Sequence, residues 1–200
     1  MIDVFVRVWP QSKVRAHLAS AVLERLAMMG DEVRVVGIYC FAMAANEYAI
    51  HLGPGNLVGL HADDFARRSR QVADEMARSP IYVVIDDDHL PIGKDWIHAG
   101  VEALERRPEY AMLSAWSING EVHAPAGEDD VFDTVSSGTP CFVRKGTFAG
   151  PLPDGAAAQY DSILSTHLLA TRGRLGFLRF VRYNHLGIGL SQVVEGHWQA

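Results

Sequence analysis

Five consecutive apolar residues, Ile81 to Ile85, are followed directly by three aspartates near the middle of the chain. A short continuous apolar run of this kind is typical of a strand that is buried on both faces of a sheet. Both faces are buried when helices pack on each side, which is the α/β class of fold. In such sheets the ligand site lies in a crevice beyond the carboxyl ends of the strands. The three aspartates are therefore expected at the edge where a ligand binds.

Strand and helix patterns alternate along the rest of the chain, as an α/β fold requires. Alternating apolar residues and runs rich in β-branched residues predict further strands, and helical spacing predicts helices between them. The predicted strands are Asp3–Trp9, Glu32–Tyr39, Tyr110–Ser117, Cys141–Arg144 and Phe177–Tyr183. The predicted helices lie between Ser12 and Gly30, from Asp63 past Met76, over 95–106 and over 157–169. Residues 42–61 and 118–136 are predicted as loops, the first with room for one short strand.

The composition is that of one soluble folded domain. The chain has 200 residues, of which 48% are hydrophobic and 21% charged, and a formal net charge of −6. This acidic balance argues against a general nucleic-acid surface, which needs clustered positive charge. No apolar run approaches the roughly 18 residues that a membrane-spanning helix needs. Cys40 and Cys141 are expected to be reduced and partly buried. The N-terminal residues do not resemble a signal peptide, and together these two features predict a cytoplasmic protein.

The acidic triplet itself, Asp86 to Asp88, is the main candidate for chemistry. Carboxylates crowded at the end of a buried strand repel one another, so a fold tolerates them best when a cation lies between them. Successive strand residues point to opposite sides, which would put Asp86 and Asp88 together and Asp87 on the other side. Such a pair suits a hard divalent ion, Mg²⁺ or Mn²⁺, that also holds phosphate oxygens. A solvated turn in which Asp87 or Asp88 bonds backbone amides is the alternative.

The segment Tyr82–Trp96, with the sequence YVVIDDDHLPIGKDW, resembles the region around the DxD motif of nucleotide-sugar glycosyltransferases with the GT-A fold, especially those of family 2. The resemblance continues in the same order along most of the chain. Its other parts are the strand Val4–Pro10, the helix Phe65–Ala77 with its Ala66-Arg67 pair, the segment Gly138–Phe148, the acidic position Gln159–Asp161 and the late Asn184–Gly187. The resemblance implies a single GT-A, Rossmann-like α/β domain over residues 1–200, with a mixed, mostly parallel central sheet and helices on both faces.

The resemblance also implies a role for each matching residue. In the implied enzyme, a metal-dependent and inverting glycosyltransferase, Asp88 and His185 bind Mn²⁺ or Mg²⁺, and Asp161 is the general base that deprotonates the acceptor hydroxyl. The residues implied in nucleotide-sugar binding are Pro10, Asp86, Asp87 and Arg67, with Arg68 and Arg70 as alternatives to Arg67. The implied partners are a UDP- or GDP-sugar donor and a glycan or other hydroxyl acceptor.

Two other functions remain open from the sequence. One is a non-catalytic sugar-nucleotide or glycan-binding module of the same fold. The other is a metal-dependent phosphohydrolase that uses the same triplet, although the Ser/Thr and Lys partners that it needs do not occur in order. Among the remaining candidates, His89 is predicted to be an exposed loop histidine and Trp96 to pack in the core. Neither cysteine has a neighbouring ligand or base, so thiol catalysis and zinc binding are not expected.

Overall fold

The computed structural model describes residues 1–9, 13–40, 57–61, 64–93, 95–117, 129–155 and 159–185. Within these ranges single α-helices separate single strands or runs of two or three strands. The strands are β1 Ile2–Val8, β2 Val33–Cys40, β3 Leu57–Leu60, β4 Ile81–Asp86, β5 His89–Pro91, β6 Tyr110–Ser117, β7 Val131–Asp133, β8 Cys141–Arg144 and β9 Arg174–His185. The helices are α1 Lys13–Ala27, α2 Phe65–Met76, α3 Trp96–Glu105 and α4 Tyr160–Thr171, with a short 3₁₀ helix, η1, at Gly30–Glu32.

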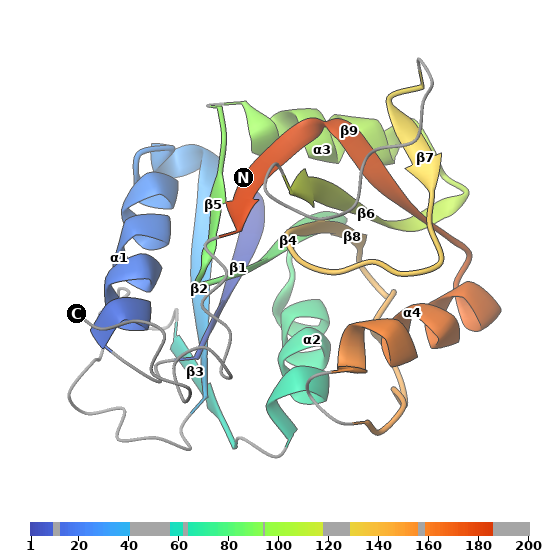
Figure 1. The fold of residues 1–200 in the computed structure, drawn as a ribbon, viewed down its shortest axis with the longest axis horizontal. Coiled ribbons are helices and arrows are strands. Elements are labelled where there is room, and N and C mark those ends of the chain that lie inside the picture. Colours follow the sequence, from blue (N-terminus) through green and yellow to red (C-terminus); the bar gives the residue numbers. More distant parts are fainter. Residues whose placement is uncertain are drawn as a thin grey trace.

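The strands form one mixed sheet in the order β3-β2-β1-β4-β8-β6-β9-β5, with β7 paired to β9 (Figure 1). β3, β2, β1 and β4 run parallel, and the register puts Arg7 of β1 beside Asp86 of β4. β8 pairs antiparallel with both β4 and β6. Beyond it, β6 and β9 are parallel, and β5 and β7 pair antiparallel with β9. The predicted mixed α/β sheet is confirmed, and its longest parallel part surrounds β1.

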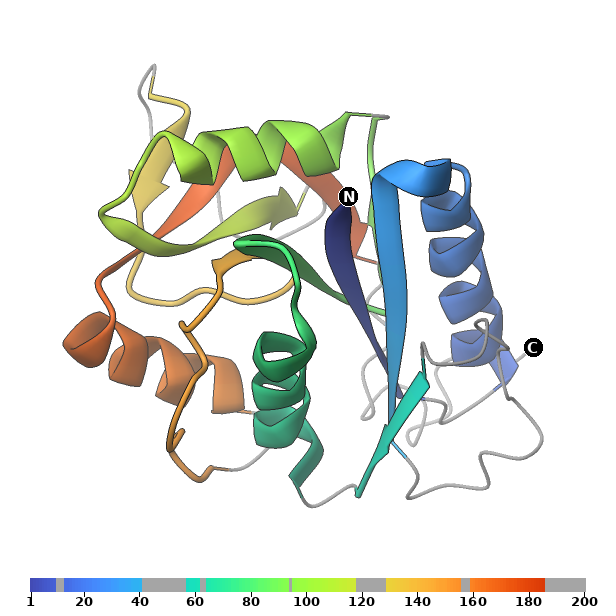
Figure 2. The ribbon, with the colours of Figure 1, turned by 180° about the vertical axis from the view of Figure 1, so that it is seen from behind.

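Helices cover both faces of this sheet, and each face has its own hydrophobic core (Figure 1 and, from behind, Figure 2). α1 and α3 pack on the face to which Val83 and Ile85 of β4 point. α2 and α4 pack on the opposite face, to which Tyr82 and Val84 point. β4 is therefore buried on both sides, as its apolar run predicts. Trp96 is buried at the start of α3, which confirms its predicted place in the core.

Two short strands lie in segments that the sequence predicts as loops. β5 follows the aspartates directly, and β7 lies within the predicted loop over 118–136. Each has three residues, too few to show a periodic pattern, and each forms by pairing with β9. β9 itself extends beyond both ends of the predicted strand Phe177–Tyr183, and its last residues pair with β5.

α3 packs closely on β8 through Gly100, and this contact gives a test of the core. A Cβ atom at Gly100 would overlap three ring atoms of Phe142, which is fully buried. We expect Gly100→Ala to lower the free energy of unfolding by about 1–3 kcal/mol, because overpacking outweighs the better helix propensity of alanine. Urea unfolding measures the change, with Glu105→Ala at an exposed position of α3 as the control. A Gly100→Ala protein as stable as the wild type would contradict this contact.

Candidate metal and donor site

The acidic triplet lies where β4 ends and the chain turns into β5. Asp86 is the last residue of β4, Asp87 and Asp88 form the turn, and His89 begins β5. β5 pairs antiparallel with the end of β9, which puts His89 opposite His185. The triplet and His185 thus meet at the carboxyl ends of β4 and β9, the kind of edge at which α/β proteins bind ligands.

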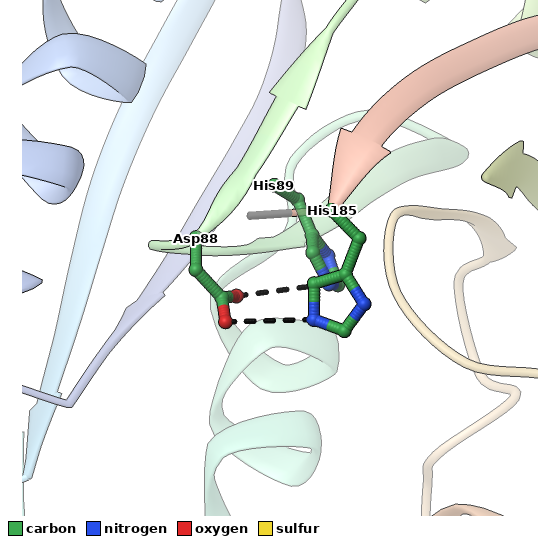
Figure 3. A group of neighbouring side chains, drawn as sticks. All are labelled: Asp88, His89 and His185. Carbon is green, nitrogen blue, oxygen red and sulfur yellow. Dashed lines mark ion pairs between the residues drawn. The ribbon is translucent and has the colours of Figure 1, made fainter. Parts of the chain in front are cut away.

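Asp88, His89 and His185, called here the Asp–His cluster, point toward one another (Figure 3). One carboxylate oxygen of Asp88 lies 3.6 Å from His89 Nε2, and the other lies 3.5 Å from His185 Nε2. The three ligand atoms all lie within 4.8 Å of one another. Asp88 and His89 are buried, whereas the His185 side chain is 45% exposed, so the cluster opens to solvent on one side. Asp88 and His185, the two cation ligands implied by the resemblance, are thus brought together, whereas Asp86, which strand alternation pairs with Asp88, is not part of this cluster.

The prediction that His89 is exposed is wrong, because this side chain is buried. In β5 its imidazole packs against the rings of Tyr183 and His185, with ring centroids 4.7 and 4.6 Å apart. Burial lowers the pKa of His89 to about 4, although the negative charges of Asp86 and Asp88 oppose this effect. The imidazole is therefore neutral near pH 7, the form in which histidine binds metal ions.

The chemistry of the Asp–His cluster fits a divalent cation. Metal ions bind imidazole nitrogens and carboxylate oxygens at about 2.0–2.2 Å, which puts the ligand atoms of one ion roughly 3–4 Å apart. Both distances from Asp88 fall in this range and are too long for good hydrogen bonds. His89 Nδ1 is buried without a hydrogen-bond partner among the described residues, and such a group typically costs about 1–3 kcal/mol. The spacing between the carboxylate of Asp88 and the two imidazoles is thus typical of metal ligands and not of hydrogen-bonded side chains.

Asp86 differs from Asp88 because its charge is neutralised within the fold. Arg7 Nε and Nη2 donate to its two carboxylate oxygens at 2.6 and 2.9 Å, and Thr139 Oγ1 donates at 2.5 Å. Burial would raise the pKa of Asp86, but the Arg7 guanidinium and these hydrogen bonds hold it well below its ordinary value. Asp86 therefore links β4 to β1 and to the segment before β8, and its contact with a donor stays a prediction.

Asp87 is fully buried and holds the end of β1. Its carboxylate accepts a hydrogen bond from the backbone N–H of Trp9 at 2.9 Å, and its own N–H donates to the carbonyl of Arg7 at 3.1 Å. This geometry matches the backbone hydrogen bond of the alternative interpretation, but the turn is not a solvated one, because Asp87 is fully buried. Pro10, the residue after Trp9, lies outside the described residues. The roles of Asp87 and Pro10 in donor binding stay predictions.

Asp161, the predicted general base, lies in the first turn of α4 and forms an ion pair with Arg70 of α2. The Arg70 side chain is 4% exposed, whereas that of Asp161 is 48% exposed. Arg70 Nη1 also donates to the carbonyl of Ala66 at 2.6 Å, and the guanidinium carbon lies 5.3 Å from the centre of the Tyr160 ring. Asp161 is therefore fixed on one side by a buried arginine and open to solvent on the other.

Two ion pairs, Arg7–Asp86 and Arg70–Asp161, form an arginine–aspartate cluster at this edge of the sheet. Arg7 interacts electrostatically with both aspartates. Burial and the positive charge of Arg7 lower the pKa of Arg70. His89 interacts electrostatically with Asp86 as well as with Asp88, so this cluster adjoins the Asp–His cluster.

A short segment before β8 touches both ion pairs of the arginine–aspartate cluster. Thr139 donates to Asp86, and a Cβ atom at Gly138 would lie 3.2 Å from Asp161 Oδ2. Buried serine hydroxyls hold this segment in place by hydrogen bonds. Ser114 Oγ donates to the Gly138 carbonyl at 2.6 Å and is also hydrogen-bonded to Ser137 Oγ. Ser165 Oγ accepts a hydrogen bond from the Ser137 N–H at 2.9 Å.

Arg67, predicted to contact the donor phosphates, is engaged elsewhere. Its guanidinium bridges Asp64 and Asp154, at 2.7 and 2.6 Å, and its side chain is 32% exposed. Arg70, one of the two alternatives to Arg67, is an arginine of α2 that does lie in the arginine–aspartate cluster. The contact between Arg67 and a donor stays a prediction.

The sequence does not single out Arg7, and it assigns His89 to the wrong environment. Arg7 is the one charged residue in the run Val4–Val8, and a charge in a buried strand needs a partner close by. That signal could have indicated the ion pair with the triplet. For His89 no such signal exists, because its burial depends on the pairing of β5 with β9.

Two further features bear on other kinds of function. Cys40 and Cys141 are more buried than predicted and neither forms a disulfide bond, and burial raises the pKa of Cys141 to about 12. A thiol with so high a pKa is a poor nucleophile near pH 7. Among the helices described, none has both the length and the apolar character to cross a bilayer.

Comparisons with known proteins identify what the fold resembles. No protein-family model and no curated protein sequence matches the chain. Among solved structures, the chain is similar to residues 1–349 of TarS from S. aureus, a glycosyltransferase, with a TM-score of 0.60 and 14% sequence identity. The alignment covers 91% of this chain and 59% of that chain. The chain has a GT-A-like, Rossmann-like α/β fold, and at this identity the likeness shows the fold alone.

Proposed function

We propose that this chain is a glycosyltransferase that moves a sugar from a nucleoside-diphosphate sugar to an acceptor hydroxyl, with a divalent cation held by Asp88 and His185. One observation carries the proposal: in a GT-A-like sheet, the side chains of these two residues converge beyond the carboxyl end of β4. Because His185 is partly exposed, a donor can reach this position from solvent.

The proposed residues divide between the donor and the acceptor. A bound Mn²⁺ or Mg²⁺ would neutralise the charge that builds up on the departing diphosphate. Asp88 and His185 would hold that ion, and Asp86, Asp87, Pro10 and Arg67 are the proposed contacts to a UDP- or GDP-sugar. Asp161 accepts the proton of the attacking acceptor hydroxyl, which is consistent with inversion at the anomeric carbon.

The position of Asp161 supports its proposed role. Arg70 fixes one carboxylate oxygen of Asp161, so the orientation of the base is set before an acceptor arrives. The other oxygen lies close to Gly138, where a Cβ atom would come within 3.2 Å of it, and the Asp161 side chain is 48% exposed. A positioned carboxylate of this kind removes a proton without first losing side-chain freedom.

Thermal shifts with nucleotides test the proposal. We expect one of UDP, GDP or CDP to raise the melting temperature in the presence of Mn²⁺ and to have little effect without it. At a concentration 100 times the dissociation constant, the rise should be about 5–10 °C for a chain of this size. Asp88→Asn should remove most of this metal-dependent shift, because the variant loses the anionic ligand of the cluster.

Asp31→Asn, which changes an exposed aspartate in η1, is the matched control and should behave as the wild type. If none of the nucleotides shifts the wild type, with or without Mn²⁺, the proposed function is wrong. A wild type that binds a donor with metal but never transfers or hydrolyses it would instead be the non-catalytic binding module.

A further inference from the structure

His89 is a buried imidazole that the proposed function does not use. Its Nδ1 has no hydrogen-bond partner in the described part of the chain. Its Nε2 lies 3.6 Å from a carboxylate oxygen of Asp88, beyond good hydrogen-bonding distance. A cation beside Asp88 would bind Nε2, the nitrogen that lies near the carboxylate, and so would account for the distance that is too long for a good hydrogen bond.

The surroundings of His89 fix the ring in one position beside Asp88 and His185. The strand register pairs His89 directly with His185 and Pro91 with Tyr183. The His89 ring meets the His185 ring edge to face, at 82° and 4.6 Å between centroids, and the Tyr183 ring lies on it at 4.7 Å. Asp88 thus has one imidazole close to each of its carboxylate oxygens.

We propose that His89 is a third protein ligand of the cation held by Asp88 and His185, and that the resulting site prefers a first-row transition ion over Mg²⁺. The inference rests on the metal site of the proposed function. Imidazole nitrogens suit Zn²⁺, Co²⁺ and similar ions, whereas Mg²⁺ favours carboxylate, carbonyl and water oxygens. Two imidazoles beside a single carboxylate therefore select against Mg²⁺, and His89 supplies one of the two.

A purely structural His89 makes different predictions. If the His89 ring only packs against β9, its replacement should change the stability of the metal-free protein and leave the affinity for metal ions unchanged. If it is a ligand, its replacement weakens binding of transition ions even when the metal-free protein is as stable as before. Metal titration in the absence of any donor separates the two cases.

The first test is titration with Co²⁺, followed by its visible absorption, and with Mg²⁺, for the wild type, His89→Ala and Asp88→Asn. The wild type should bind Co²⁺ at least tenfold more tightly than Mg²⁺. His89→Ala should weaken Co²⁺ binding at least tenfold and alter the spectrum, with little change for Mg²⁺. Circular dichroism of the metal-free proteins shows which variants are folded. Unchanged Co²⁺ affinity and spectrum in folded His89→Ala overturn the inference.

A second test does not require His89 to be replaced. With Mn²⁺ bound, pulsed electron paramagnetic resonance detects coordinated imidazole nitrogens. In His185→Ala, one imidazole should still be coupled to the Mn²⁺, and its absence overturns the inference. Asp88→Asn distinguishes the two proposals: if it binds Co²⁺ like the wild type, the metal site of the proposed function fails as well. If Asp88→Asn loses Co²⁺ while His89→Ala keeps it, the proposed function stands and the role of His89 fails.

Discussion

Asp161→Asn is expected to lower the rate of sugar transfer by about 10²–10⁴-fold while leaving donor binding close to that of the wild type. Asparagine has nearly the same size as aspartate but cannot accept the proton of the acceptor hydroxyl. In the proposed function other residues hold the donor and its cation, so the nucleotide-dependent thermal shift should survive. Transfer rates at saturating donor and acceptor, with thermal shifts on the same samples, separate the two effects.

Asp130→Asn is a suitable control for Asp161→Asn, because Asp130 is an exposed aspartate at the start of the β7 region. It should match the wild type in both measurements. Full transfer activity in Asp161→Asn would show that another group is the base. Loss of donor binding together with transfer would indicate instead that the ion pair with Arg70 is needed to shape the donor site.

Arg7→Met is expected to lower the free energy of unfolding by about 3–5 kcal/mol near pH 7, because it leaves the carboxylate of Asp86 buried without its partner. The side chains of Arg7 and Asp86 are 11% and 21% exposed, so solvent cannot replace the lost ion pair well. Urea unfolding at constant pH measures the change. Arg106→Met, at an exposed arginine with a 3.8 Å pair to Glu102, should change stability by less than about 0.5 kcal/mol.

The pH dependence gives a second measurement on Arg7→Met. In the wild type the pKa of Asp86 is depressed, so its contribution to stability is present above an ordinary aspartate pKa of about 4 and is lost as the pH falls below it. In Arg7→Met the effect of burial should no longer be opposed by the guanidinium, so the pKa of Asp86 should rise and its protonation should remove the cost of burying an unpaired charge. The stability difference between the two proteins should therefore narrow at acid pH. The double variant Arg7→Met/Asp86→Asn should regain part of the free energy of unfolding that Arg7→Met loses. A difference between wild type and Arg7→Met of equal size at every pH would contradict this explanation.

Most of the longer strands follow from the sequence, because apolar patterns report burial directly, although β5 and β7 are missed and β9 is longer than predicted. The run Ile81–Ile85 is the central strand, and the predicted strands Tyr110–Ser117 and Cys141–Arg144 have the bounds of β6 and β8. The convergence of Asp88 and His185 follows from the resemblance of their two segments to a known family. None of these predictions needs knowledge of how distant side chains pair.

The rest of the site depends on such pairing, which local patterns do not encode. The burial of His89 requires β5 to meet β9, which lies almost a hundred residues further along the chain. Asp86 and Asp88 are equivalent in the sequence, yet Arg7, 79 residues away, neutralises one of them and not the other. Among the arginines of α2, the choice between Arg67 and Arg70 depends on which side of the helix faces the sheet, and the two differ in exposure accordingly.

The Ser137–Thr139 segment joins the two halves of the proposed reaction mechanically. It bonds the carboxylate at the end of β4 through Thr139 and borders the carboxylate at the start of α4 through Gly138. Ser114 and Ser165 anchor it to β6 and α4. A displacement of the segment would therefore alter the distance between Asp86, a proposed donor contact, and Asp161, the proposed general base. This distance, as well as the acidity of the acceptor hydroxyl, would then determine which acceptors can react at this edge of the sheet.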